Sequence, residues 1–282
     1  MKPERPSIDK GLARRAFARA ADGYDDVAVL QREIGERLLE RLDYLRAHPA
    51  VALDLGCGTG QIAAGLLRRY PKARVLALDF AEPMLAHARR VGRWRRRPAC
   101  LCGDMEQLPL ADASLDMICS NLAFQWAGSR ERLFAECRRV LRPDGVLMFT
   151  TFGPDTLQEL RAAWRAVDGH AHVNPFDDMH DIGDELLHAG FADPVMDVER
   201  LSLTYDDVFA LMRDLKQLGA HNVLSGRPRG LTGRDALARM RSAYEAFRCD
   251  GRLPASYEVI HGQAWKIERG ECRVPLDQLK PE

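Results

Sequence analysis

Residues 51–60, VALDLGCGTG, constrain the fold more than any other segment of the 282-residue chain. The first five, four apolar and one acidic, are typical of a short buried strand, and three glycines follow at alternate positions. Beyond them Ile62, Leu66, Leu67 and Tyr70 recur at helical spacing, so the turn opens onto a helix N-terminus with unbonded backbone N–H groups. A strand, a glycine-rich turn and a helix in this order predict a ligand site built against backbone.

The spacing of these glycines narrows the class of ligand. Gly56, Gly58 and Gly60 form GxGxG, whereas a dinucleotide-binding turn needs its third glycine where this chain has Gln61. Asp54 precedes the turn, and its carboxylate would repel a pyrophosphate but could bind an ammonium group. The segment resembles the first motif of class I S-adenosylmethionine-dependent methyltransferases, whose cofactor has an amino acid end and a sulfonium. A tight turn without a ligand is the alternative.

A second acid follows at the distance expected for a ribose-binding carboxylate. Residues 73–80, ARVLALDF, predict a short strand with Asp79 near its end. About 20 residues past the glycines, a Rossmann-type sheet presents a carboxylate to both ribose hydroxyls. Asp79 could instead, or in addition, cap the helix predicted over residues 83–90.

Two further predicted strands end in polar residues. One ends before Asp104 and Met105, an acid for the adenine amino group and an apolar side chain to cover its ring. The other, residues 115–120, is followed by Asn121. Because ligands of parallel sheets bind at the carboxyl ends of the strands, these ends predict one site. The predicted cofactor-binding residues are Asp54, Gly56, Gly58, Gly60, Asp79, Phe80, Met84, Asp104, Met105 and Asn121.

Strands and helices alternate along the first half of the chain, which predicts a parallel sheet with right-handed crossovers. The methyltransferase resemblance implies an α/β, Rossmann-like fold with a mostly parallel seven-stranded sheet flanked by helices. We expect an N-terminal helical cap over residues 1–48, a cofactor-binding core over 49–152 and a substrate-side half over 153–282. A helical lid, about residues 205–250, would precede the last strand.

The elements around the core follow from apolar periodicity. A helix is predicted to begin near Asp9 and to break at Gly23, and residues 24–45 predict one long amphipathic helix. These helices must pack on the sheet or roof its carboxyl edge, so Tyr24 is either a site residue or a core tyrosine. Beyond residue 150 we expect helices at 156–167, 179–189, 207–218 and 235–247, a strand at 195–205, and a last strand at 257–266 that pairs at the sheet edge.

Composition excludes some classes of partner and site. The 41 basic residues balance the 41 acidic ones, so overall charge gives no support for binding nucleic acid or membrane. The seven cysteines contain no CxxC pair or zinc spacing, which indicates reduced thiols and no metal site. With no apolar signal segment or membrane-spanning run, we expect a cytoplasmic protein.

Several longer segments carry a narrower resemblance. The entry RRAFARAADGYD, the core DLGCGTG, and LPLADASLD, SNLAFQW, HVNPFDDMHDIGDELLHAGF and LKQLGAHN together resemble the malonyl-[acyl-carrier protein] O-methyltransferases that open the pimelate arm of biotin synthesis. This resemblance spans nearly the whole chain. It implies methylation of the free carboxylate of a malonyl thioester by S-adenosylmethionine, leaving S-adenosylhomocysteine. Many members of this family have an arginine after the HVN asparagine, where this chain has Pro175.

Two other functions are compatible with the same features. One is methylation of a different small acceptor, such as a quinone precursor or a free dicarboxylic acid. The other is the role of a respiratory complex I assembly factor with this fold, which the segments DTLQELR and HAGF resemble. In that case the chain would still bind the cofactor, but cofactor binding would not by itself show that the chain transfers a methyl group.

The malonyl reaction implies particular residues. A free carboxyl is ionised at neutral pH, so alignment and exclusion of water matter more than a general base. We expect Tyr24 and Trp126 to shape the reaction pocket and Arg161 to hold the carboxylate. The lid is net +5 between residues 213 and 241, which suits docking of an acidic acyl carrier protein, although a solvated helical face is the alternative. Its basic residues are Arg213, Lys216, Arg227, Arg229, Arg234, Arg239 and Arg241.

Overall fold

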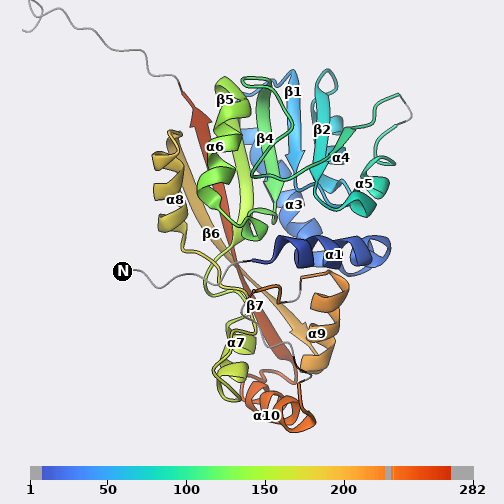
Figure 1. The fold of residues 1–282 in the computed structure, drawn as a ribbon, viewed down its shortest axis with the longest axis vertical. Coiled ribbons are helices and arrows are strands. Elements are labelled where there is room, and N and C mark those ends of the chain that lie inside the picture. The colour runs from blue at the N-terminus through green and yellow to red at the C-terminus, as the bar shows by residue number, and fades with distance from the viewer. Residues whose placement is uncertain (1–7, 94, 221, 226–229, 231, 268–282) are drawn as a thin grey trace, which may run out of the picture.

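The computed structural model describes residues 8–93, 95–220, 222–225, 230 and 232–267, which contain one seven-stranded sheet (Figure 1). Its order is β3-β2-β1-β4-β5-β7-β6, with the first five strands parallel and β7 antiparallel to both neighbours. The strands are β1 Val51–Leu55, β2 Arg74–Asp79, β3 Ala99–Cys102, β4 Leu115–Asn121, β5 Leu141–Phe152, β6 Ala192–Tyr205 and β7 Leu253–Lys266. The expected α/β class and mostly parallel sheet are confirmed.

The last strand does not lie at the sheet edge, and that prediction is wrong. β7 lies between β5 and β6, and β6 forms the edge. The side chains explain this order: β6 alternates between buried or half-buried and exposed positions, whereas β7 is buried along most of its length. A strand that is buried on both faces belongs inside a sheet, and a strand with one solvated face tolerates an edge.

Ten α-helices lie in the described ranges, and apart from α2 and α3 their bounds fall close to those expected. They are α1 Lys10–Ala20, α2 Tyr24–Val27, α3 Val29–Arg41, α4 Gln61–Arg69, α5 Glu82–Ala88, α6 Arg130–Val140, α7 Gln158–Arg165, α8 Met179–His188, α9 Val208–Gln217 and α10 Arg234–Glu245. Short 3₁₀ turns occur at Ala21–Gly23, Leu42–Tyr44 and Phe124–Trp126. Residues Pro143, Asp144 and Gly145 lie within β5, where Asp144 has a φ of 61° and the register with β4 shifts.

The predicted helix over residues 24–45 is interrupted, which corrects that expectation. Ala28 has φ −78° and ψ 40°, outside the helical region, and separates α2 from α3. Polar contacts hold the segment before the break: Arg32 donates to the carbonyl of Asp25, and Thr59 donates to the Asp25 carboxylate at 2.8 Å. These contacts fasten α2 to the glycine turn, so tertiary contacts override the helical periodicity.

Alternate residues of the strands face two separate cores. Leu53 and Leu55 of β1 pack on the side covered by α6 and α8, and Ala52 packs on the side covered by α3 and α4. β6 and β7 run beyond β5, because β7 pairs with β5 only from Val259 onward. Helices α7, α9 and α10 pack around this extension (Figure 1). Within the described ranges, the chain has no helix with the length and apolar character needed to span a membrane.

Candidate functional site

Two adjoining cavities lie at the carboxyl ends of β1, β2 and β4. Helix α1 lies across this end of the strands (Figure 1). Cavity A is lined by Phe17, Asp79, Phe80, Met84, Asp104, Met105 and Trp126, among others. Cavity B is lined by Asp25, Gln31, Arg32, Asp54 and Gly60, among others. Tyr24, Gly56, Gly58 and Asn121 line both. The predicted cofactor-binding residues therefore gather around one continuous space.

The glycine turn has a conformation that only glycine adopts without strain. Gly56, Gly58 and Gly60 have φ values of 73°, 52° and 96°. A Cβ on Gly56 would lie 2.3 Å from the Ala123 Cβ, and one on Gly60 would meet Ala88 at about 3 Å. A Cβ on Gly58 would meet nothing within 4 Å. Gly56 and Gly60 are thus required by packing, whereas Gly58 leaves its backbone open to the cavities.

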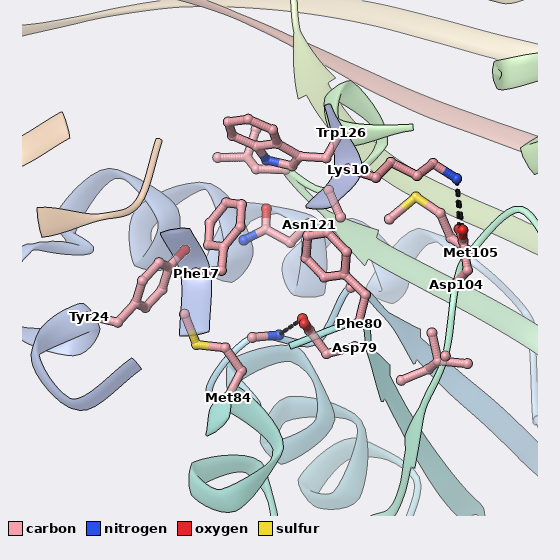
Figure 2. A pocket seen from close by; sticks show the side chains of 16 residues that line it. Lys10, Phe17, Tyr24, Asp79, Phe80, Met84, Asp104, Met105, Asn121 and Trp126 are labelled. Carbon is pink, nitrogen blue, oxygen red and sulfur yellow. Dashed lines mark hydrogen bonds and ion pairs between the residues drawn. The ribbon is translucent and has the colours of Figure 1, made fainter. Parts of the chain in front are cut away.

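The Asp79 carboxylate is held at the floor of cavity A. It accepts a hydrogen bond from the backbone N–H of Gly58 at 2.9 Å (Figure 2). It accepts a second one from the backbone N–H of Ala81 at 2.8 Å. Burial raises the pKa of Asp79 to about 6 against these hydrogen bonds, which lower it. Ala81, not Asp79, is the N-cap of α5, so the capping alternative is not what the structure shows. The carboxylate instead ties the glycine turn to β2.

Asp54 is buried at the wall of cavity B with one oxygen unsatisfied. Its Oδ2 accepts a hydrogen bond from the Ala63 backbone at 2.8 Å, and its Oδ1 has no hydrogen-bond partner. Burial, with a smaller contribution from the nearby charge of Asp79, raises the pKa of Asp54 to about 7 against the Ala63 hydrogen bond, which lowers it. An unpaired buried carboxylate is unfavourable unless a cation or donor reaches it. This arrangement is suited to an ammonium group.

Aromatic side chains enclose the other end of cavity A (Figure 2). The Phe17 ring lies edge-on to Trp126, with 5.0 Å between ring centroids, and 6.0 Å from Phe80. Tyr24 approaches from the helical segment that precedes β1, and burial raises its pKa above the usual range. A planar apolar ligand would fit among these rings, and water would be largely excluded from it.

Asp104 and Met105 also line cavity A, although Asp104 already has a partner. The Lys10 ammonium lies 2.8 Å and 3.0 Å from the two carboxylate oxygens (Figure 2). This contact and the Glu106 backbone N–H lower the pKa of Asp104, against a rise from burial. Asn121 donates to the Gln31 carbonyl at 2.9 Å and accepts from Thr150 at 2.7 Å, so its amide is fixed by the scaffold.

A third space, cavity C, adjoins these two on the side of α7 and α9. Its lining includes Leu160, Trp164, Tyr205, Met212, Leu215 and Tyr257. It shares Trp126 with cavity A and Gln31 with cavity B, and the Gln31 Oε1 is buried without a hydrogen-bond partner. The described lining contains neither lysine nor arginine. Cavity C is thus a mainly apolar space that adjoins the other two, and its polar groups are amides, hydroxyls, the His172 ring and the Asp214 carboxylate.

Arg161 lies elsewhere than expected. Its guanidinium donates to the carbonyls of Pro154 at 2.7 Å and Thr156 at 2.9 Å, and it lines a fourth space, cavity D, rather than cavities A to C. The structure brings Tyr24 and Trp126 to the cofactor-side cavities but not Arg161. The reason is the phase of α7, which turns this residue toward the loop before the helix.

The predicted docking residues are exposed on the far helices. Arg213 and Lys216 belong to α9, and Arg234, Arg239 and Arg241 belong to α10. Arg227 and Arg229 lie outside the described residues. The cavity residues that the sequence did not predict include Lys10, Phe17 and Gln31. Phe17 could have been recognised because it lies beside the apolar face that Leu12, Ala16 and Ala20 form on the first helix. Lys10 and Gln31 had no comparable feature in the sequence.

The residues that line cavities A and B match the chemical groups of S-adenosylmethionine. The unpaired Asp54 Oδ1 suits its ammonium group, and Gly58 permits a close approach to the backbone. Asp79 and the aromatic residues of cavity A suit a ribose and a purine ring. The chemistry of these groups fits the cofactor.

Comparison with known proteins is consistent with this geometry. Residues 53–149 match a family model described as a methyltransferase domain. The malonyl-[acyl-carrier protein] O-methyltransferase of Laribacter hongkongensis is 57% identical over 267 residues, covering 92% of this chain and 90% of its own. Among solved structures, the YcgJ protein of Bacillus subtilis has a TM-score of 0.59 at 18% identity, covering 83% of this chain and 100% of its own. A SAM-dependent methyltransferase of Thermotoga maritima, a possible histamine N-methyltransferase, has a TM-score of 0.55 at 18% identity, covering 90% and 99%.

Proposed function

The chain belongs to the malonyl-[acyl-carrier protein] O-methyltransferase family, and on that premise we propose that it methylates the free carboxylate of a malonyl group carried by an acyl carrier protein. The observation that carries the proposal is the contact of cavity C with cavities A and B at Trp126 and Gln31. An acyl group in cavity C would meet the cofactor at that junction. Family membership favours this function over the assembly-factor and other-acceptor alternatives.

In this proposal Asp54 holds the ammonium group of the cofactor, Asp79 the ribose, and Asp104 with Met105 the adenine. Gly56 and Gly60 keep the turn in place, and Gly58 exposes its backbone. Phe17, Phe80 and Met84 enclose the ring system, and Asn121 supports the wall shared by cavities A and B. S-adenosylmethionine, when bound, supplies an electrophilic methyl group on a sulfonium.

The residues of the junction orient the acceptor. A malonyl carboxylate is ionised at neutral pH, so it needs no general base to become a nucleophile. Tyr24 and Trp126 restrict its approach and exclude water, which favours in-line alignment. Since cavity C has no described lysine or arginine, the side-chain donors of its lining are amides such as that of Gln31, hydroxyls and the His172 ring.

The partner would be recognised on the proposed lid, residues 205–250. Arg213, Lys216, Arg234, Arg239 and Arg241 are exposed, and none of them forms an ion pair with another described residue. Such a cationic surface increases the association rate with an acidic carrier protein and orients it.

The proposal is tested by transfer of labelled methyl from S-adenosylmethionine to malonyl-acyl carrier protein. Malonyl-coenzyme A, acetyl-acyl carrier protein and free malonate serve as comparison substrates. We expect a base-labile ester mainly on the malonyl carrier protein. If no malonyl thioester becomes labelled while the cofactor still binds, the proposed reaction is wrong.

The docking surface has its own test. Reversing charge at Arg213, Arg239 and Arg241 together should raise KM for the carrier protein and weaken its salt dependence, with malonyl-coenzyme A little affected. Reversing the exposed Arg46, Arg68 and Arg90 together is the matched control. Equal effects of the two sets would refute the assignment of this surface.

A further inference from the structure

Cavity D adjoins cavity C and shares no lining residue with the cofactor-side cavities A and B. The walls common to C and D come from α7 and the loop after it, namely Trp164, His172, Val173 and Phe176. Trp164 and His172 stack with 3.8 Å between ring centroids, which gives this shared wall a flat surface. Cavity D therefore lies next to cavity C along this wall.

Cavity D presents two arginines that lack an ionic partner. Arg161 and Arg165 are four residues apart on α7, so their side chains leave the same face of the helix. Neither forms an ion pair with any residue in the described ranges. Burial lowers the pKa of Arg161, and the charge of Arg165 lowers it further. The nearby Asp155 is paired with Arg200 at 3.2 Å.

The one carboxylate in the lining of cavity D does not neutralise the arginines. Asp168 accepts hydrogen bonds from the His170 backbone at 2.9 Å and contacts the His172 ring at 2.9 Å. Arg161 is also preorganised, because carbonyls of Pro154 and Thr156 fix two of its N–H groups and leave three without a described acceptor. The cavity thus offers positioned cationic donors without a matching anion.

A competing exit from cavity C lacks this property. Another space, lined by Phe134, Phe149, Arg130 and Glu185 among others, meets cavity C at Gln125, Phe152 and Phe176. Its arginine, Arg130, is already paired with Asp177 and, at 2.5 Å, with Glu185. A second anion there would have to displace one of these carboxylates.

We propose that cavity D is the phosphate subsite for the arm that delivers the malonyl group, with Arg161 and Arg165 binding the phosphate of a phosphopantetheine. The inference rests on the proposed function. Acyl carrier proteins hold their acyl group as a thioester at the end of an arm that is attached through a phosphate. Since the malonyl carboxylate must lie next to the cofactor, the thioester and the arm must leave cavity C on the opposite side. The cations at that exit match the charge at the far end of the arm.

The positions of the helices agree with this route. Helix α10, which carries Arg239 and Arg241, packs beside α7, which carries the two arginines of cavity D (Figure 1). A carrier protein docked on α10 would present its arm close to the entrance of cavity D. The docking surface and the phosphate subsite would then form one continuous cationic path to cavity C.

The test compares two small substrates that differ only by the phosphate, malonyl-4′-phosphopantetheine and malonyl-pantetheine. The central variant is Arg165→Gln, because the Arg165 side chain donates to no described residue and its loss should leave the fold intact. Arg161→Gln is the second variant, and Arg90→Gln, at an exposed arginine far along the chain, is the matched control. We expect Arg165→Gln to lower kcat/KM for the phosphorylated substrate by about threefold to tenfold, with no change for malonyl-pantetheine.

Binding of unacylated 4′-phosphopantetheine, measured by calorimetry, separates this inference from the proposed reaction. Wild-type binding that weakens in Arg165→Gln but not in Arg90→Gln supports the subsite even if no methyl transfer is observed. Methyl transfer that shows no preference for the phosphorylated substrate overturns the subsite and leaves the reaction standing. An equal loss on both substrates also overturns it, because that pattern indicates a structural role.

Discussion

The buried Asp54 carboxylate should make cofactor affinity depend on pH. Its pKa is raised to about 7 in the ligand-free protein, mainly by burial, so the group is protonated below neutrality. Binding of an ammonium group requires the ionised form. Affinity for S-adenosylhomocysteine should therefore fall as pH decreases through about 7, and binding should release a proton in that range.

The size of this effect follows from the pKa. With a free-protein pKa of about 7 and an ionised carboxylate in the complex, the dissociation constant at pH 6 should be roughly tenfold higher than its high-pH limit. The proton released per bound ligand should rise from about 0.5 at pH 7 to about 0.9 at pH 6. Calorimetry in buffers of different ionisation enthalpy measures both quantities on the same samples.

Two controls assign the effect to Asp54. Asp54→Asn should bind S-adenosylhomocysteine more weakly at pH 8 but without the steep pH dependence. Methylthioadenosine has the adenosine part without the ammonium group, so its affinity should follow only Asp79, whose pKa is raised to about 6. Affinity that is constant between pH 5.5 and 8, or equally pH-dependent in Asp54→Asn, would refute the reasoning.

Two further predictions concern the fold. Gly56→Ala should lower the free energy of unfolding by about 2–3 kcal/mol in denaturant melts, because its Cβ would meet Ala123 at 2.3 Å in a left-handed conformation. Gly58→Ala should lower the free energy of unfolding by only about 1 kcal/mol. In the folded protein it should weaken cofactor binding more than Gly56→Ala does. A larger loss of stability in Gly58→Ala than in Gly56→Ala would contradict the packing argument. Burial, aided by Arg41, lowers the pKa of His261 to about 4. The unfolded chain therefore binds more protons between pH 4 and 6.5, and stability should fall on acidification, by about 1 kcal/mol from pH 6.5 to 5.5, relative to a His261→Asn variant. Parallel pH profiles of the two proteins would contradict this.

The local sequence predicted those site residues whose positions depend only on the strand or turn that contains them. Asp54, Asp79 and Asn121 belong to strands β1, β2 and β4, and a parallel sheet brings such ends to one edge. The glycine positions follow from the turn that joins β1 to α4. None of these placements depends on contacts between distant segments, so a single sequence was sufficient.

Tertiary contacts decided what the sequence left open. Helix α1 covers cavity A partly because the Asp9 backbone donates to the Val223 carbonyl at 3.0 Å, a contact across more than 200 residues that no local pattern encodes. That contact helps to place Phe17 and Lys10 at the cavity. The orientation of the Arg161 side chain likewise depends on the carbonyls of Pro154 and Thr156, which accept hydrogen bonds from its guanidinium. Its positive charge alone had suggested that it would bind the substrate carboxylate.

The break at Ala28 shows why such a departure from periodicity can serve the site. In a continuous helix Tyr24 and Gln31, seven residues apart, would lie on the same face and enter the same space. Because the helix is interrupted between them, Tyr24 lines cavities A and B whereas Gln31 lines B and C. One short segment thereby supplies a wall to the cofactor side and to the acyl side. The contacts of Asp25 with Thr59 and Arg32 that hold this break also join it to the glycine turn, so the geometry of the two ligand sites is set by the same few hydrogen bonds.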